Sequence, residues 1–271
     1  MTLVILFVFG AIIGSFLNVL SLRWPKPDEE GTKLSLSIFA GRSSCPSCGN
    51  KLQWFELVPI FSFVFLAGKC RSCGIKISWQ YPLVELVTGL VFASLFITIS
   101  PSDILSTIYY LISTIIFCIY IVIFVYDAWY KIIPNQLVYS AILLALVYRV
   151  STHFLVPSTS NLDLLAGVII FSFFGLIWLL SKGRAMGFGD AKLGLSIGLL
   201  LGAASGFSAI ILAFWTGALV ALSLMMLGKL GFLNKAKGLT MKSELPFAPF
   251  IILGAWLAFV FSLDILHVAL F

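Results

Sequence analysis

Charged side chains are scarce in this sequence. They make up 10% of its 271 residues, whereas apolar residues make up 61%. A soluble domain has about 25% charged residues, so this chain lacks the polar surface needed to cover a water-soluble globule. The scarcity argues against a soluble protein and predicts that lipid is the solvent of most of the chain.

Two charge patterns are also missing. No long apolar stretch carries a row of basic side chains, so the net charge of +6 does not indicate nucleic-acid binding. No cation precedes the first apolar run, and Arg23 and Lys26 follow it. A secretion signal has the opposite order. We therefore predict a retained first helix whose N-terminus lies outside the cytoplasm.

Eight apolar segments are long enough, or nearly long enough, to cross a hydrocarbon core of about 30 Å. The segment 190–202 is the shortest, but a helix there keeps the loop charges on consistent sides. We predict an all-α polytopic membrane protein with about eight transmembrane helices. The segments cover residues 3–22, 83–99, 104–126, 136–150, 162–181, 190–202, 205–228 and 246–269.

The positions of the cations support this topology. With the N-terminus outside, all of the 17 Lys and Arg residues except Arg149 fall on the cytoplasmic side, as the positive-inside rule requires. The predicted organisation is a first transmembrane helix at 1–22, a cytoplasmic zinc-binding insertion at 23–80 and a seven-helix membrane body at 81–271.

Four of the five cysteines lie in the insertion as two C-x-x-C-G pairs, Cys45 with Cys48 and Cys70 with Cys73. The 21 residues between the pairs are close to the spacing of a four-thiolate zinc site. A reducing cytoplasm disfavours two disulfides, while a redox pair stays open as an alternative. Four protein ligands leave no position for water, so we expect a structural Zn²⁺. Cys118 is expected to pack within a helix.

Two aspartates stand at the cytoplasmic ends of predicted helices. Asp127 closes one apolar run, and Asp190 opens another. Two carboxylates that meet in a dry site share a proton, so one can act as base and the other as acid in peptide hydrolysis. The residues alone also allow each aspartate to be a helix cap, and Asp190 to be a partner of Lys192. Glu85, just inside the second helix, is expected to be structural.

Several motifs together resemble the bacterial type IV prepilin peptidases, nearly from end to end of the chain. Phe188 and Ala248 depart from the residues usual in that family. The motifs are Gly14-Ser-Phe-Leu-Asn18-Val, the two C-x-x-C-G pairs, Tyr81-Pro-Leu-Val-Glu85-Leu, Asp127 followed by Ile133-Pro134-Asn135, Gly187-Phe-Gly189-Asp190-Ala-Lys192, and Pro246-Phe-Ala-Pro249-Phe.

The resemblance implies a G-x-G-D aspartyl protease of the bacterial cytoplasmic membrane. Its catalytic pair would be Asp127 and Asp190, with Gly187, Gly189 and Lys192 shaping the site. Such enzymes remove a short basic leader from prepilins or pseudopilins, which would be the partners of this protein together with membrane lipids.

The same resemblance extends to a second activity. Many members of the family N-methylate the newly exposed residue with S-adenosylmethionine. The sequence has no G-x-G-x-x-G motif of a Rossmann-type methyltransferase. A methyl-donor site is therefore expected in the membrane body and the zinc loop.

Two functions of other classes account for parts of the sequence. A cation- or proton-coupled transporter would explain carboxylates in helices, but it normally holds them near the bilayer midplane within repeats. A membrane-anchored zinc-binding interaction protein would explain the cysteine loop and leave the G-x-G-D segment without a purpose.

Overall fold

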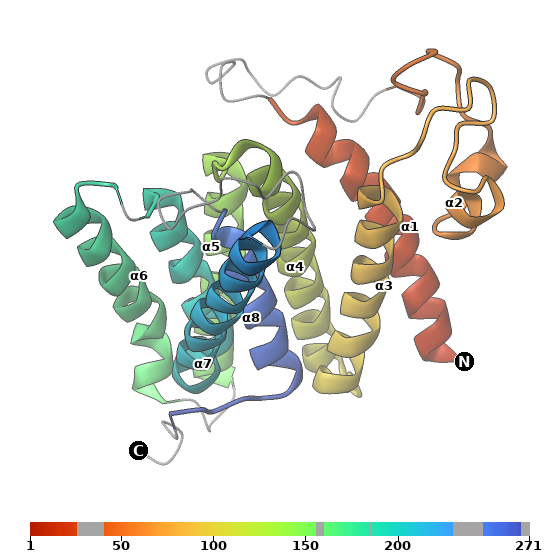
Figure 1. The fold of residues 1–271 in the computed structure, drawn as a ribbon. Coiled ribbons are helices and arrows are strands. Elements are labelled where there is room, and N and C mark those ends of the chain that lie inside the picture. The colour runs from red at the N-terminus through yellow and green to blue at the C-terminus, as the bar shows by residue number, and fades with distance from the viewer. Residues whose placement is uncertain (26–40, 156–159, 185, 230–245, 267–271) are drawn as a thin grey trace. The chain divides into compact units, whose positions relative to one another are not determined.

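The computed structural model describes residues 1–25, 41–155, 160–184, 186–229 and 246–266. In these ranges the regular elements are helices, and six of them are long and apolar enough to cross a membrane, which confirms the all-α polytopic architecture (Figure 1). The elements are α1 (Thr2–Arg23), η3 (Trp54–Leu57), α2 (Phe61–Phe65), α3 (Gln80–Ile99), α4 (Ile104–Tyr130), α5 (Asn135–Leu155), α6 (Asn161–Ser181), α7 (Phe188–Lys229) and α8 (Ala248–Val260).

The longest helix, α7, consists of two segments. It breaks at Gly202, where φ is 79° and ψ is −167°, as the separate predicted runs 190–202 and 205–228 require. Counting both segments of α7 and the shorter apolar helix α8, the described residues contain eight apolar helical segments.

The predicted end of the last helix is wrong. Residues 246–269 were expected to form one helix, but α8 ends at Val260. The N–H of Leu263 bonds to the carbonyl of Ala258, and Ser262 has a left-handed φ of 47°, which is the usual way of terminating a helix. Apolar residues continue in the sequence beyond this turn, so a prediction from hydropathy alone does not detect the end of the helix.

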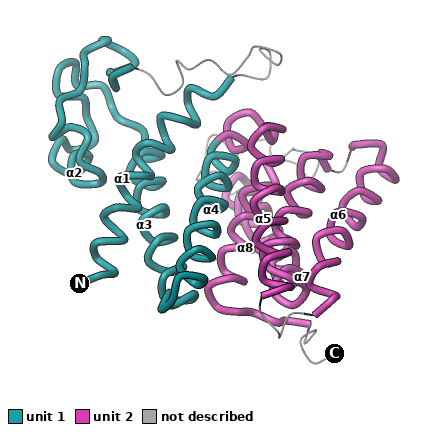
Figure 2. Tube along the Cα trace, turned by 180° about the vertical axis from the view of Figure 1, so that it is seen from behind, with its two compact units in different colours: residues 1–125 teal, residues 126–271 magenta. Residues whose placement is uncertain are grey.

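The chain forms two compact units, residues 1–125 and 126–271 (Figure 2). The first contains α1, the cysteine loop from residue 41, α3 and most of α4; the second runs from the last turn of α4 to α8. Five cations of the predicted cytoplasmic loops lie outside the described residues: Lys26, Lys33, Lys235, Lys237 and Lys242.

In the first unit α1 packs closely on α3. A Cβ atom at Gly14 would lie 2.8 Å from the Cα of Glu85, so only glycine allows this approach of the two backbones. The fully buried Asn18 donates a hydrogen bond from Nδ2 to the carbonyl of Tyr81 at 3.2 Å. The Gly14–Asn18 motif therefore fixes the start of α3 against α1.

In the second unit α7 packs against α5, α6 and α8, and polar groups hold its break. Arg149 of α5 is buried and donates from Nε to the Leu199 carbonyl at 2.8 Å and from Nη2 to the Leu200 carbonyl at 2.9 Å. Beyond the break, the N–H of Ala203 donates to Oδ1 of Asp163 at 2.8 Å. Arg149, the one cation that the predicted topology places on the outer side, thus satisfies backbone carbonyl groups inside the protein.

Candidate active site and metal centre

Asp127 lies in the last turn of α4 and is 5% exposed. Its carboxylate accepts a hydrogen bond from the N–H of Ala248, the first residue of α8. Among the residues that the structure describes, Oδ2 of Asp127 is buried without a hydrogen-bond partner. An unsatisfied buried acceptor costs about 1–3 kcal/mol, so the position is unfavourable for stability and points to a function.

Asp190 lies in the first turn of α7 and is 8% exposed. Its carboxylate accepts from the N–H of Gly187, and its own N–H donates to the Gly187 carbonyl at 3.2 Å. The charge of Asp127 acts directly on the Asp190 carboxyl group. The second unit therefore brings together two carboxylates that stand on different helices.

The two glycines of the G-x-G-D segment differ in what surrounds them. A Cβ atom at Gly189 would lie 3.0 Å from the Cβ of Ile133, whereas at Gly187 the nearest atom would be Oδ2 of Asp190 at an ordinary 3.6 Å. A side chain at position 189 would therefore be crowded against Ile133, whereas one at position 187 would not. The contact also joins this segment to the Ile133-Pro134-Asn135 motif.

Lys192 makes the second connection between these motifs. Its Nζ donates to Oδ1 of Asn135 at 2.8 Å and lies 4.8 Å and 5.2 Å from the ring centroids of Tyr139 and Phe188. Because Lys192 has partners of its own, Asp190 is not explained as the counterion of that lysine. The lysine instead fixes the start of α7 against α5.

The two C-x-x-C-G pairs in the first unit fold into matching turns. In the first, the N–H of Cys45 bonds to the Asn50 carbonyl and the N–H of Gly49 to the Cys45 carbonyl; Cys70, Ile75 and Gly74 repeat the pattern. The glycines have φ of 68° and 71°, which an L side chain rarely adopts. This conformation explains the glycine after each pair.

The four sulfur atoms fit a single tetrahedral ion. They lie within 4.8 Å of one another, and Sγ of Cys45 is 3.9 Å from Sγ of Cys73. A Zn–S bond of about 2.3 Å places tetrahedral ligands roughly 3.8 Å apart. The fifth cysteine, Cys118, lies in α4 and is not one of this group.

The thiols interact strongly before any ion is considered. The N–H groups of Cys48 and Ser47 lower the pKa of Cys45 to about 6. At Cys73 the N–H of Ile75 also lowers the pKa, but burial and the three neighbouring cysteines outweigh it and raise the pKa to about 11. Four groups this close do not all ionise without a cation, so the cluster suits a bound metal.

Comparisons with known proteins identify the family. Residues 8–99 match the sequence model of the Bacterial Peptidase A24 N-terminal domain, and residues 114–222 match that of the Type IV leader peptidase family. The prepilin leader peptidase/N-methyltransferase of Bacillus subtilis is 36% identical over 95% of this chain and 94% of its own length. The chain belongs to the type IV leader peptidase family.

Proteins of the same name occur in other bacteria. The relative from Aeromonas hydrophila is 27% identical over 95% of this chain and 90% of its own length. The relative from Vibrio cholerae is 35% identical over 74% of this chain and 78% of its own length. No solved structure matches the chain.

Three residues that contact a buried carboxylate, or carry one, were not predicted as site residues. Ala248 contacts Asp127 through its N–H, and its place in the Pro246–Phe250 motif was the only signal. Glu85, expected to be structural, accepts a hydrogen bond at Oε2 from the N–H of Ile60 at 2.7 Å. No sequence motif around Ile60 predicts this contact.

We predict that the purified protein carries about one metal ion per chain. Changing both Cys45 and Cys73 to Ser should remove the ion, because each change replaces a thiolate ligand by a poor one. Metal analysis by mass spectrometry measures the content, and Cys118→Ser is the matched control that keeps the ion. Stoichiometric metal in the double variant, or disulfides in protein freshly purified from the cytoplasmic membrane, would contradict the assignment.

Proposed function

We propose that this protein is a membrane aspartyl endopeptidase that removes the leader peptide of prepilins or pseudopilins and N-methylates the new terminus with S-adenosylmethionine. The observation that carries the peptidase assignment is the pair Asp127 and Asp190, buried together with one carboxylate oxygen unpartnered. The names of the relatives support both activities.

The geometry suits general acid–base hydrolysis. In the proposed mechanism the two carboxyl groups share one proton, because two anions this close in an apolar site repel each other. The ionised member takes a proton from water as the water oxygen attacks the scissile carbonyl carbon. The protonated member donates to the carbonyl oxygen. The tetrahedral intermediate then collapses as the amine leaves with a proton from the pair.

A helix-capping role explains only one of the two aspartates. Asp190 stands in the first turn of α7, where the helix dipole favours an anion. Asp127 stands in the last turn of α4, where the dipole disfavours one. The transporter hypothesis is also weakened, since both carboxylates lie at helix ends and the sequence relatives are peptidases.

We further propose that the cysteine cluster holds Zn²⁺ in a structural role. In the described residues from 41 to 79 the loop has only two short helical turns and two isolated bridges, and so small a segment needs a metal to hold its fold. The loop is assigned to the cytoplasm and the N-terminus to the opposite side. The division into 1–22, 23–80 and 81–271 belongs to this proposal.

We predict that Asp127→Asn and Asp190→Asn each reduce leader cleavage by about 10²-fold or more, because removing an essential acid or base costs about that factor. The double variant should be hardly worse than either single variant, since the two groups act as a unit. The measurement is cleavage of a purified prepilin by detergent-solubilised enzyme, followed on gels.

The control for these variants is Asp103→Asn, which makes the same chemical change at an exposed position before α4. It should cleave at the wild-type rate. All variants should retain the metal, because the cysteines lie in the other unit. If either Asp127→Asn or Asp190→Asn cleaves at a near wild-type rate, the acid–base mechanism is wrong and the helix-capping explanation is favoured.

A second prediction concerns the G-x-G-D backbone. Gly189→Ala should lower cleavage, because its Cβ would lie 3.0 Å from the Cβ of Ile133 and the two segments would have to move apart by a few tenths of an ångström. Gly187→Ala makes the same change where space exists and should be much milder. The cleavage rates of the two variants, compared at equal metal content, test whether Gly189→Ala is the more harmful change. Equal losses would show that close packing at Gly189 does not position Asp190.

A further inference from the structure

Residues 54–65 of the cysteine loop, which comprise η3 and α2, expose large apolar side chains. Trp54, Phe61, Val64 and Phe65 are between 62% and 85% exposed, and we call these four residues the apolar patch. The two short helices that carry the patch pack against each other. Exposed apolar surface of this kind marks a contact with a protein or with a membrane.

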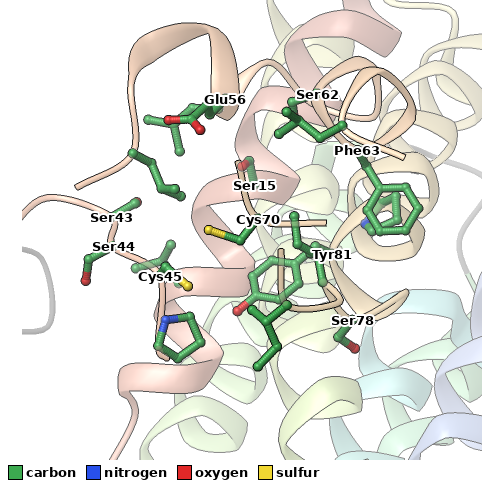
Figure 3. Close-up of a pocket in the computed structure, with 18 of the residues that line it drawn as sticks. Ser15, Ser43, Ser44, Cys45, Glu56, Ser62, Phe63, Cys70, Ser78 and Tyr81 are labelled. Atoms are coloured by element: carbon green, nitrogen blue, oxygen red, sulfur yellow. The ribbon is translucent and has the colours of Figure 1, made fainter. Parts of the chain in front are cut away.

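The polar residues of the segment lie on the side of the protein. Glu56 and Ser62 are the only side chains of residues 54–65 with a carboxyl or hydroxyl group. Both line a cavity of about 550 Å³ that α1, the cysteine loop and the start of α3 enclose. Figure 3 shows Glu56 and Ser62 at this cavity together with Ser15 of α1. The segment thus turns polar groups inward and apolar groups outward, the reverse of a loop that faces water.

Two contacts fix the depth of α2 along the membrane span α3. The 20 residues of α3 give a length of about 30 Å, which is the thickness of a hydrocarbon core, so Gln80 at its start lies at the membrane surface. Glu85 then lies about 8 Å below that surface. The N–H of Ile60, just before α2, donates to Oε2 of Glu85 at 2.7 Å. Phe63 of α2 packs on Trp79, just before α3, with ring centroids 4.8 Å apart.

These contacts place α2 beside the first turns of α3 rather than beyond the end of the membrane helices. Figures 1 and 2 both show α2 alongside α1, level with the part of α1 that precedes its last turns. The cavity confirms the neighbourhood, because Ser62 of α2 and Ser15 of α1 line it together. The apolar patch therefore lies at the depth where a bilayer changes from headgroups to acyl chains.

Glu85 explains how an irregular loop can lie at this depth. Lipid offers no hydrogen bonds, so a backbone N–H outside a regular helix needs an acceptor from the protein. Ile60 has φ of 63°, a strained conformation for a β-branched residue, and the buried carboxylate of Glu85 is its acceptor. A carboxylate in an apolar helix is costly, and here it holds α2 against α3.

The charge of the loop favours anionic lipid. Residues 41–79 contain five cations and one carboxylate, that of Glu56. A zinc ion with four thiolates has a net charge of about −2, which still leaves the loop positive. Lys69 and Lys76 are exposed and pair in an isolated bridge that follows α2 in the chain. Basic and aromatic side chains are the groups that hold proteins at the headgroup level.

We propose that residues 54–65 form an interfacial membrane anchor. The apolar patch inserts among lipid acyl chains, the neighbouring cations contact anionic headgroups, and Glu85 positions α2 from within the protein. Interfacial elements bury apolar side chains about 5–10 Å into the boundary of headgroups and acyl chains, which agrees with the depth of Glu85. The anchor holds the metal turns against the membrane surface, and this inference does not rest on the proposed peptidase activity.

The test is photo-crosslinking of the metal-loaded full-length protein in nanodiscs of phosphatidylethanolamine and phosphatidylglycerol. Benzoylphenylalanine replaces Phe65 or, in a second variant, Phe61, so that an aromatic side chain is kept at each position. Mass spectrometry after illumination identifies the molecule attached to the probe. Both positions are expected to yield lipid adducts several-fold more abundant than those from the same probe at Ser72, an exposed polar position in the second metal turn.

A pair of variants with the probe at position 65 tests the contact that positions α2. Glu85→Gln keeps an acceptor oxygen and should keep the lipid adducts. Glu85→Leu removes the acceptor and should lower their yield several-fold. Metal content measured on each variant reports whether the loop is folded. Equal yields in the two folded variants would overturn the role assigned to Glu85.

Three outcomes of the probe experiment would overturn the anchor itself. The first is attachment to a second copy of the chain in place of lipid. The second is attachment to a purified prepilin added to the nanodiscs, with loss of the lipid adducts. The third is lipid adducts at positions 61 and 65 that are no more abundant than those at Ser72, since this would show that the apolar patch faces water.

Discussion

Lipid offers no hydrogen bonds, so each polar group inside these helices must find its partner within the protein. The structure meets this constraint repeatedly. Asn18 bonds to the start of α3, and Arg149 bonds to the backbone carbonyls that the break of α7 would leave unsatisfied. Oδ2 of Asp127, like Oγ of Ser113, is buried without a hydrogen-bond partner among the described residues. Of these two atoms, only Oδ2 belongs to a carboxylate that has a second carboxylate as its neighbour.

The two polar centres, the aspartate pair and the cysteine cluster, are built differently. In the second unit, the ends of α4 and α7 bring two carboxylates into apolar surroundings, and the contacts Gly189–Ile133 and Lys192–Asn135 fix the helix that carries Asp190. In the first unit, a loop with little secondary structure forms a cavity, and its four thiols suit a metal.

Much of this could be predicted from the sequence, because the decisive signals are local. Long apolar runs predict helices, so the expected run 3–22 and the observed α1 at Thr2–Arg23 differ by one residue at each end. The C-x-x-C-G spacing likewise predicted the thiol cluster that the structure contains. Glycine and aspartate at helix boundaries directed attention to Asp127 and Asp190, whose catalytic role remains a proposal.

Features that depend on packing between distant segments could not be predicted. The N–H of Ala248 reaches Asp127 only because α8 begins beside the end of α4, and no local pattern encodes that contact. Glu85 was expected to be structural, but its partner, the N–H of Ile60, lies 25 residues earlier in the chain, and no local pattern marks that contact. The end of α8 was misplaced because apolar residues continue beyond the turn at Ser262.

The central claim is that Asp127 and Asp190 act together on one tetrahedral species. The most direct test is the binding of a leader–helix peptide whose scissile amide is replaced by a hydroxyethylene group, compared with the same peptide lacking the hydroxyl. The account predicts that the hydroxyl tightens binding to the wild type by about 10²-fold or more, as transition-state analogues do. It also predicts that this gain disappears in both Asp127→Asn and Asp190→Asn. A hydroxyl that contributes nothing in the wild type, or a gain that survives in either variant, would contradict it.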